Sequence, residues 1–329
     1  MYNYNQLIII NNYIDFFELG GKMMRNLSDN QIIEQIASAN ALRNKWKEND
    51  AKRDFGVGTP TVREINNVSY INSENEDNDI WHKMNIYYPK NKEKDSYPVI
   101  INVHGGGFFY GDKELYSLYT KNLADRGFAV VNFNYRLAPE NKYPAAFYDV
   151  CYLVEFIIKN AEKYKFDLTR LYMIGDSAGA FLVCQYSIFA SNDTYKRIFK
   201  NLEVKTEIPK KVVLNCGIYN LDLKLDGEMC DWYLENEISD EYKNSVFKLL
   251  DYLNNDFPYA FIMTSVNDPL RVRTKCLLDT LERLNKDFIY REYGYDTPND
   301  AHVFHLDMNS KAGIECNEAE IAFLKNNIF

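Results

Sequence analysis

The chain has 329 residues, 46% of them hydrophobic, which is enough for the core of one large α/β domain with a modest appendage. Its 38 Lys and Arg residues stand against 47 Asp and Glu residues, so the net charge is -9, and a surface this acidic repels phosphate backbones and excludes nucleic acid as an expected partner. No apolar stretch has the length of a membrane-spanning helix, so we expect no membrane partner.

The first residues carry no secretory signal, because the apolar run at 7–10 is short and no cationic segment precedes it. Gly20-Gly21-Lys22 before Met23 can be encoded by a bacterial ribosome-binding site that runs into a start codon. We therefore interpret residues 1–22 as a translated leader that the natural chain lacks; a dispensable, disordered arm is the alternative. Mass spectrometry of the native protein separates the two, since a peptide covering 2–22 would contradict the leader.

The next segments predict a helix and a hairpin. Ser28 and Gln31 form a capping-box pattern, and the helical spacing of Ile32, Ile36 and Ala39 predicts an amphipathic helix over about 28–47. The runs at 68–71 and 81–88 alternate in polarity on either side of an acidic turn at 73–79. They indicate two antiparallel strands.

From residue 97 onward, compact apolar runs alternate with helical patterns. This rhythm predicts βαβ units and a mostly parallel sheet that is covered by helices on both faces. The expected strands are 99–103, 129–133, 171–174, 212–214, 259–263 and 288–290, and the expected helices are 147–164, 178–190, 271–285 and 314–326.

Two segments fall outside that rhythm, the first helix and the acidic, helix-like stretch at about 221–255. Insertions at the loop end of an α/β sheet commonly form lids. We therefore expect N-terminal cap helices at 23–55 and a main domain at 56–329, with 221–255 inserted so that both segments form one small cap.

The six cysteines form no C-x-x-C pair and have no metal-ligand spacing. We expect them to be reduced core thiols of a cytoplasmic protein, and we expect no metal site and no cofactor. They are Cys151, Cys184, Cys216, Cys230, Cys276 and Cys316.

A nucleophile motif, Gly175-Asp176-Ser177-Ala178-Gly179, matches G-x-S-x-G between the strand at 171–174 and the helix that opens near Ala178. A strand that reverses into a helix within a few residues places Ser177 on a strained backbone with its hydroxyl projecting. Side chains at Gly175 or Gly179 would collide with the neighbouring strand or helix. We interpret Ser177 as a nucleophile; an ordinary glycine-rich turn is the alternative.

A second motif, His104-Gly105-Gly106-Gly107-Phe108, follows the strand at 99–103. A tetrahedral intermediate carries negative charge on oxygen and needs preorganised N–H donors. Glycines let the backbone turn its N–H groups inward, so we predict an oxyanion hole from Gly105, Gly106 and Gly107 together with the N–H of Ala178. The sequence leaves open which two of the three glycines donate.

These motifs, with Tyr135-Arg136-Leu137-Ala138-Pro139-Glu140 and Tyr143-Pro144-Ala145-Ala146, resemble the hormone-sensitive-lipase-like branch of the α/β-hydrolases over about residues 85–328. The resemblance implies an eight-stranded, mostly parallel sheet with a helical cap, and ester hydrolysis without a cofactor. The chain departs from the family pattern at Ala180, where a second glycine is usual, and at Val272, where an acidic residue is usual. Neither departure removes a catalytic group.

The resemblance also implies the acid and the base, in the chain order nucleophile, carboxylate, histidine. Asp268 opens the family-like Asp268-Pro269-Leu270-Arg271, and His302 matches the family's His-x-Phe pattern. Asp296 and Asp300 are the alternative acids and His305 is the alternative base, with His305 otherwise structural.

Other residues near the motifs receive weaker roles. We expect Phe108, Phe109 and Tyr110 to line the acyl pocket or to pack under the cap. We expect Asp176 to make backbone or loop hydrogen bonds, and Arg136 and Glu140 to form a structural pair.

The sequence therefore predicts a cytoplasmic serine carboxylesterase that cleaves small esters of short to medium acyl chain through an acyl-enzyme. One alternative is an amide hydrolase, a formamidase or a small peptidase, on the same triad. Another is a catalytically silent small-molecule receptor on the same fold, although such receptors typically lose the histidine. The sequence leaves open whether the chain forms a homodimer.

Overall fold

The computed structural model describes residues 29–51, 58, 60–71, 80–90, 93–235, 238–295 and 300–326. The interpreted leader at 1–22, the capping residue Ser28, the acidic turn at 73–79 and the alternative acid Asp296 lie outside these ranges. Within them, no helix is both long enough and apolar enough to cross a membrane.

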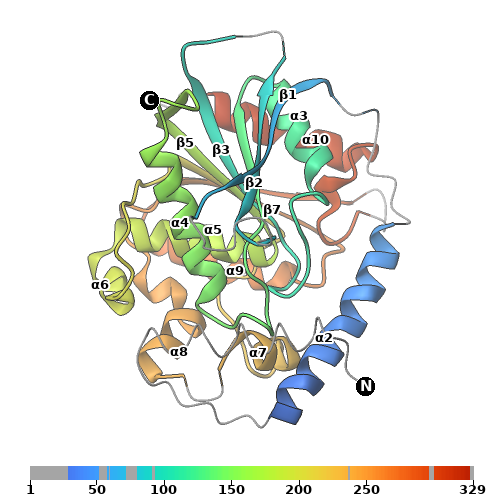
Figure 1. The fold of residues 1–329 in the computed structure, drawn as a ribbon, viewed down its shortest axis with the longest axis vertical. Helices are drawn as coiled ribbons and strands as arrows, with labels where there is room; N and C mark the ends of the chain where they lie inside the picture. Colours follow the sequence, from blue (N-terminus) through green and yellow to red (C-terminus); the bar gives the residue numbers. More distant parts are fainter. Residues whose placement is uncertain are drawn as a thin grey trace.

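Eight strands form one sheet in the order β1-β2-β4-β3-β5-β6-β7-β8 (Figure 1). β2 pairs antiparallel with β1 and with β4, and all other neighbours are parallel. This confirms the expected eight-stranded, mostly parallel sheet. The strands are β1 (Val62–Ser69), β2 (Lys83–Pro89), β3 (Tyr97–Val103), β4 (Ala129–Phe133), β5 (Phe166–Asp176), β6 (Lys211–Asn215), β7 (Tyr259–Ser265) and β8 (Phe288–Tyr293).

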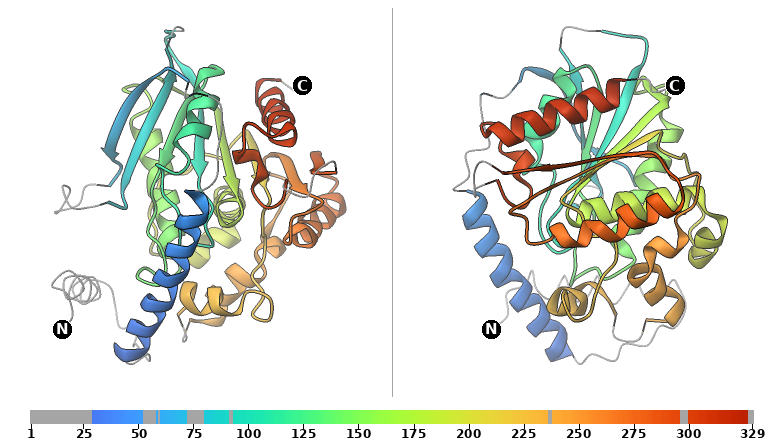
Figure 2. Two further views of the ribbon diagram at one scale, coloured as in Figure 1. Left: turned by 90° about the vertical axis from the view of Figure 1, so that its right-hand side faces the viewer. Right: turned by 180° about the vertical axis from the view of Figure 1, so that it is seen from behind.

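The helices connect the strands and cover both faces of the sheet. Successive strand residues point to opposite faces, so Ile101 packs in one cluster with α4, α5 and α9, while Ile100 packs in the other with α3 and α10. In the view from behind, α10 lies over the sheet (Figure 2). The helices are α2 (Asp29–Asp50), α3 (Ser117–Asp125), α4 (Ala145–Lys159), α5 (Ala178–Ser191), α6 (Asp193–Lys196), α7 (Gly227–Tyr233), α8 (Asp240–Phe247), α9 (Arg271–Arg283) and α10 (Lys311–Lys325), with short 3₁₀ turns η1 (Arg197–Phe199), η2 (Leu249–Tyr252) and η3 (Phe304–Leu306).

Several elements differ from the sequence prediction. β5 begins at Phe166, five residues before the predicted strand, α4 ends at Lys159, five residues before the predicted helix end, and α6 was not predicted. β1 begins at Val62, six residues before the predicted strand, because this edge strand carries polar residues that break the alternation. α3 was not predicted; it is only nine residues long, and four of these are buried, which is too short for a clear helical stripe.

The helices α7 and α8 come from the insertion at 221–255, and α2 lies beside α7 (Figure 1). Ser38 Oγ of α2 donates a hydrogen bond of 2.8 Å to Glu228, and Gln35 Nε2 donates one of 3.3 Å to the carbonyl of Asp231. The structure thus brings together the two segments that the expected cap requires.

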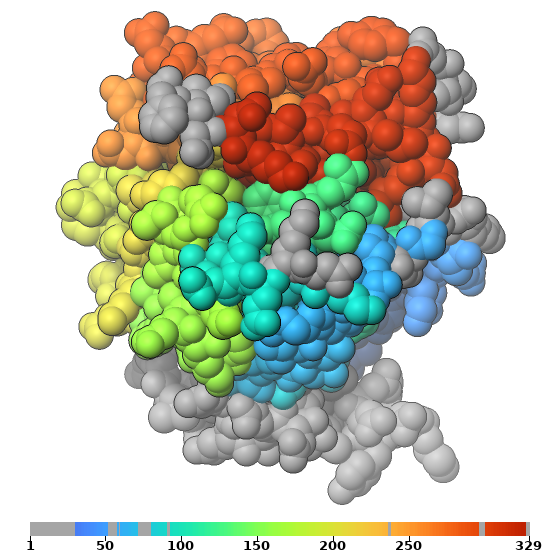
Figure 3. Space-filling model, turned by 90° about the horizontal axis from the view of Figure 1, so that it is seen from above, coloured from blue at the N-terminus to red at the C-terminus, as the bar shows by residue number. Residues whose placement is uncertain are grey.

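At the end of the sheet opposite α7 and α8, the last helix adjoins α3, as the space-filling view shows (Figure 3). The Tyr119 hydroxyl of α3 donates a hydrogen bond of 2.7 Å to the buried Glu320 of α10. Arg126, at the end of α3, pairs with Glu318 at the surface of the same helix. These pairs hold α10 against α3, and Asn215 at the end of β6 donates a hydrogen bond of 2.7 Å to the same Glu320.

Candidate active site

Ser177 lies between β5 and α5 in the strained conformation that the motif predicts. Its φ is 51° and its ψ is -119°, in a region that a residue with a side chain seldom occupies. Its N–H donates a hydrogen bond of 2.9 Å to the carbonyl of Asn215 at the end of β6. The neighbouring strand therefore holds the turn in place.

The two glycines of the turn are required by close backbone contact. A methyl group on Gly175 would meet the backbone of Gly179, and one on Gly179 would overlap the carbonyl of Val103 on β3. The expected collisions are confirmed. Because no side chain intervenes, α5 packs directly against β3 and its N-terminus points toward the turn.

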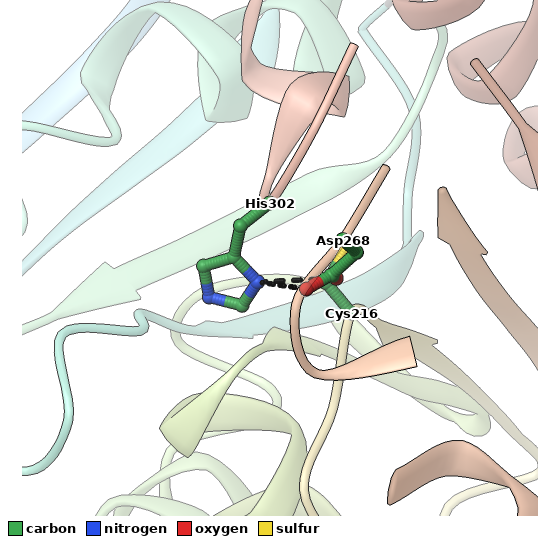
Figure 4. A group of neighbouring side chains, drawn as sticks. All are labelled: Cys216, Asp268 and His302. Carbon is green, nitrogen blue, oxygen red and sulfur yellow. Dashed lines mark hydrogen bonds and ion pairs between the residues drawn. The ribbon is translucent and has the colours of Figure 1, made fainter. Parts of the chain in front are cut away.

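Asp268 and His302 form a hydrogen-bonded pair beyond the ends of β7 and β8. His302 Nδ1 lies 3.1 Å from each carboxylate oxygen of Asp268 (Figure 4). Burial raises the pKa of Asp268, but the hydrogen bond and the charge of His302 outweigh it and hold that pKa below its usual value. An ionised carboxylate can only accept, so Nδ1 of His302 carries the proton that is donated to Asp268, and Nε2 points away from Asp268 (Figure 4).

The end of β6 connects this pair to the nucleophile. Asn215 accepts the hydrogen bond from the N–H of Ser177, and the next residue, Cys216, lies beside Asp268 and His302. The described part of the chain contains no hydrogen bond between the Ser177 hydroxyl and His302. Catalytic hydrogen bonds often tighten only when substrate binds.

Cys216 was not singled out in the sequence beyond being a core thiol. Its sulfur, the carboxylate of Asp268 and the imidazole of His302 lie within 4.8 Å of one another, and these are donor types that Zn²⁺ accepts. However, the hydrogen bond between Asp268 and His302 already uses the nitrogen and the oxygens that an ion would need. Burial also raises the pKa of the Cys216 thiol well above its usual value, which disfavours the thiolate ligand.

The oxyanion loop, residues 104–110, follows β3. The N–H of Gly105 donates to Asp176 Oδ1 at 3.1 Å and to the Tyr116 hydroxyl at 3.0 Å, so it is not free for a substrate. The prediction that included Gly105 as a donor is corrected for this reason. Among the described residues, no acceptor binds the N–H of Gly106 or Gly107, and these two glycines remain as candidate donors with Ala178.

Asp176 makes the loop hydrogen bonds that the sequence predicted. Its second oxygen accepts a hydrogen bond of 2.8 Å from the Tyr116 hydroxyl, and its side chain fills the space beside Gly105 that a Cβ would need. Burial raises the pKa of Asp176 to about 6. One carboxylate thus ties the residue before the nucleophile to the start of the oxyanion loop.

The three aromatic residues after the glycines pack under the cap. Phe108 is fully buried and stacks on Tyr233 of α7 with ring centroids 4.0 Å apart. Phe109 contacts Trp232 of α7 at 4.8 Å. The Tyr110 hydroxyl donates a hydrogen bond of 2.7 Å to Asp50 at the end of α2. The two roles expected for these residues were lining the acyl pocket and packing under the cap, and these contacts are of the packing kind.

The alternative base is buried and structural. His305 lies in η3 with 1% of its surface exposed, and burial lowers its pKa to about 3, so it stays neutral. His104 stacks on Tyr135 with centroids 4.1 Å apart, and burial lowers its pKa to about 4. Asp300, the alternative acid, is buried, and its backbone carbonyl accepts a hydrogen bond from the Ser265 hydroxyl.

The expected pair of Arg136 and Glu140 is wrong. Arg136 pairs with the buried Asp149 of α4, with Nη2 2.6 Å from the carboxylate, whereas Glu140 pairs with Arg43 of α2 at 2.6 Å. One feature of the sequence could have indicated a partner for Arg43. Arg43 lies four residues after Ala39, on the face of α2 that packs against the rest of the protein, and a charge on such a face needs a partner.

Comparisons with known proteins agree with this geometry. A family model described as BD-FAE matches residues 84–270, more than half of the chain. Arylacetamide deacetylase-like 2 of Homo sapiens is 27% identical over 227 residues, covering 63% of this chain and 52% of that protein. Acetyl esterase of Salmonella schwarzengrund (strain CVM19633) is 25% identical over 227 residues, covering 64% of this chain and 66% of that protein.

The matched region thus spans less than two thirds of either relative. Among solved structures, esterase B from Lactobacillus rhamnosis superposes with a TM-score of 0.78 at 20% identity, covering 89% of this chain and 95% of that one. The carboxylesterase EstE1, from a metagenomic library, superposes with a TM-score of 0.68 at 22% identity, covering 87% and 96%. Likenesses of this kind show a shared α/β-hydrolase fold.

Proposed function

The chain belongs to the BD-FAE family, and from this membership we propose that it is a serine carboxylesterase for small esters of short to medium acyl chain. The observation that carries the proposal is the hydrogen-bonded pair of His302 and Asp268 beside the strand that holds Ser177 in its strained turn. The relative named acetyl esterase supports an acyl ester as substrate. Because the matches cover only part of the curated relatives, the activity of the whole protein is part of the proposal.

In the proposed reaction, the Ser177 oxygen attacks the acyl carbonyl while His302 Nε2 takes the hydroxyl proton. Asp268 holds the protonated Nδ1 and stabilises the imidazolium that forms. His302 then gives the proton to the leaving alcohol, and the acyl group stays on Ser177. A water molecule, deprotonated by the same nitrogen, releases the acid and restores the serine.

The negative oxygen of both tetrahedral intermediates is assigned to the N–H groups of Gly106, Gly107 and Ala178. Within the described ranges, none of these N–H groups has a protein acceptor, and Ala178 is the first residue of α5, where N–H groups point out of the helix. The aromatic packing of Phe108 and Phe109 against α7 supports a small acyl group, because bulky side chains occupy the space under the cap.

An amide is the second candidate substrate. A relative named arylacetamide deacetylase, from Oryctolagus cuniculus, is 32% identical over 145 residues that cover 43% of this chain and 34% of that protein. The same serine, base and donors would serve an amide, with His302 protonating an amine instead of an alcohol.

All six cysteines carry free thiols, which supports our placement of the protein in a reducing compartment such as the cytoplasm.

The test compares wild type with Ser177→Ala on p-nitrophenyl acetate, butyrate and octanoate and on p-nitroacetanilide. We expect kcat to fall by about 10⁴-fold or more in the variant. The matched control is Ser187→Ala, a buried serine of α5 whose hydroxyl donates to the Val183 carbonyl, and its kcat should stay near that of wild type. Preference for acetate or butyrate over octanoate would support the small acyl group.

Undiminished hydrolysis by Ser177→Ala would exclude Ser177 as the nucleophile. Hydrolysis of the anilide alone would favour the amide candidate. If folded wild type turned over none of these substrates, the esterase proposal would fail and a receptor would become the better interpretation.

A further inference from the structure

The helix α2 contacts the oxyanion loop along one face. The indole of Trp46 packs on Phe109 with ring centroids 4.8 Å apart and on Tyr110 at 5.5 Å. Asp50, one turn further on, accepts the hydrogen bond of the Tyr110 hydroxyl. The contact therefore covers the part of the loop that directly follows the glycines.

Arg43 lies on the same face, one turn before Trp46, and its side chain binds backbone carbonyl groups. Its Nε donates a hydrogen bond of 2.6 Å to the carbonyl of Phe109, and its Nη2 donates one of 2.6 Å to the carbonyl of Ala138. Both of its terminal nitrogens also bind Glu140, each at 2.6 Å. The side chains of Arg43 and Glu140 are each 18% exposed, so this ion pair is largely screened from water.

The position of these bonds matters because of the glycines before them. The N–H of Ala138 binds the carbonyl of Phe108 at 2.9 Å, and the carbonyl of Gly106 accepts from the N–H groups of Phe109 and Tyr110. The loop is thus held immediately after Gly107, and Asp176 holds it at Gly105.

Between these two anchors, Gly106 and Gly107 have φ angles of 110° and 60°. Glycine has little conformational preference of its own, so the direction of these N–H groups depends on what holds the ends of the segment.

From this arrangement we propose that Arg43 is a positioning residue for the oxyanion hole. By holding the Phe109 carbonyl, it keeps the N–H groups of Gly106 and Gly107 turned toward the developing oxyanion. The inference rests on the proposed hydrolase function. It differs from a purely structural role, in which Arg43 only docks α2 on the main domain, because docking alone would leave the conformation of the loop and kcat unchanged.

The kinetic test uses Arg43→Ala and Arg43→Lys with the best substrate found for wild type. Misplaced donors weaken transition-state binding more than ground-state binding, so kcat should fall about 10- to 100-fold in Arg43→Ala while KM changes by less than about threefold. Arg43→Lys should recover part of kcat, because one ammonium can reach one carbonyl but cannot also bind Glu140 through two nitrogens.

The matched control is Arg126→Ala, which removes an arginine–glutamate pair at the surface, where the arginine side chain is 37% exposed. Its kcat should equal that of wild type. Arg126 also binds its glutamate through both terminal nitrogens. The comparison therefore separates the effect of losing an arginine–glutamate pair in general from the effect of losing the pair that holds the loop.

Hydrogen–deuterium exchange of residues 104–111, measured without substrate, gives a second readout. Exchange should be faster in Arg43→Ala, partly restored in Arg43→Lys and unchanged in Arg126→Ala. If Arg43→Ala does not fold, Arg43→Lys carries both measurements. Loop exchange like that of wild type, or a kcat within about twofold of it, would overturn the proposal. Inactive wild type would overturn the proposed function alone, since exchange still decides whether Arg43 holds the loop.

Discussion

At the scale of single residues, two buried carboxyl groups, those of Asp176 and Glu320, lie close to the site. Burial raises the pKa of Asp176 to about 6 and that of Glu320 to about 7. The buried His104 and His305 have lowered pKa values of about 4 and about 3. As pH rises from about 4.5 to 6.5, the two carboxyls ionise more readily in the unfolded chain than in the folded one, so their contribution to stability falls. As pH falls over the same range, the two histidines take up protons in the unfolded chain but stay neutral in the folded one, so their contribution falls in the opposite direction. Their effects on stability therefore oppose each other.

Glu320→Gln isolates one of these contributions. The pKa of Glu320 is about 7 in the folded protein against the ordinary value of 4.5, so its contribution to stability is full below pH 4.5 and is lost as pH rises through about 7. Glutamine resembles the protonated acid and does not titrate. Relative to wild type, the variant should therefore gain about 2 kcal/mol of unfolding free energy between pH 5 and pH 8.

Urea denaturation at the two pH values measures this gain. Glu318→Gln is the control, because Glu318 lies on the same helix with a side chain that is 52% exposed, and it should show no such gain. A difference between Glu320→Gln and wild type that does not change with pH would contradict the raised pKa.

At the scale of elements, one lysine joins the main domain to both parts of the cap. The Nζ of Lys142 donates to the carbonyls of Asp231, Trp232 and Leu234 at the end of α7, at 2.7 to 3.2 Å, and to Gln35 of α2 at 3.1 Å. A cation at a helix C-terminus also interacts favourably with the helix dipole. Phe109 packs against the same two helices, so the loop after β3 and these helices are stabilised together.

Lys142→Met should loosen α7 more than the sheet. Methionine keeps the length of the side chain but leaves these carbonyls without their donor, which should cost about 1–3 kcal/mol. Hydrogen exchange of residues 227–235 should become faster than exchange of β3 and β5. In the control, Lys159→Met removes a lysine that is 52% exposed and pairs with Glu155 within α4, and it should change neither. Equal loosening of sheet and cap would show that Lys142 supports the whole fold instead.

At the scale of the whole molecule, a buried ion pair joins three distant segments. Asp149 of α4 has no exposed surface, accepts from the backbone and guanidinium of Arg136 after β4, and lies 3.3 Å from His82 before β2. Burial raises the pKa of Asp149, but the charge and hydrogen bonds of Arg136, together with the nearby His82, outweigh it and lower that pKa to about 2. The stability that Asp149 contributes is therefore present above pH 4 and is lost only as pH falls toward 2.

Asp149→Asn should destabilise the protein by about 3–5 kcal/mol, because it leaves the guanidinium of Arg136 buried without its counter-charge. Denaturant unfolding at neutral pH measures the loss. Asp279→Asn breaks an exposed pair with Lys275 and should cost less than about 1 kcal/mol. A loss as small as that of the control would mean that Arg136 finds other acceptors.

Local patterns in the sequence were sufficient for much of the fold. The strand at 129–133 coincides with β4, and the helix predicted at 178–190 begins at the same residue as α5. Both depend on apolar spacing and on the glycines of the turn, which act between neighbours in the chain. The strained turn at Ser177 followed from the same local chemistry, whereas the pairing of Asp268 with His302 was predicted from the family resemblance.

Only the tertiary structure decided which polar groups meet across the chain. Three such contacts join residues that lie 13 to 97 positions apart in the chain. The N–H of Gly105 donates to Asp176, Arg136 pairs with Asp149, and Arg43 binds Glu140. A charged side chain needs a partner of opposite charge or a hydrogen-bonding partner if it is buried. The sequence offers many residues that could serve as this partner equally well. The packing of α2 on the loop after β3 brings Arg43 to Glu140 and so selects one of them.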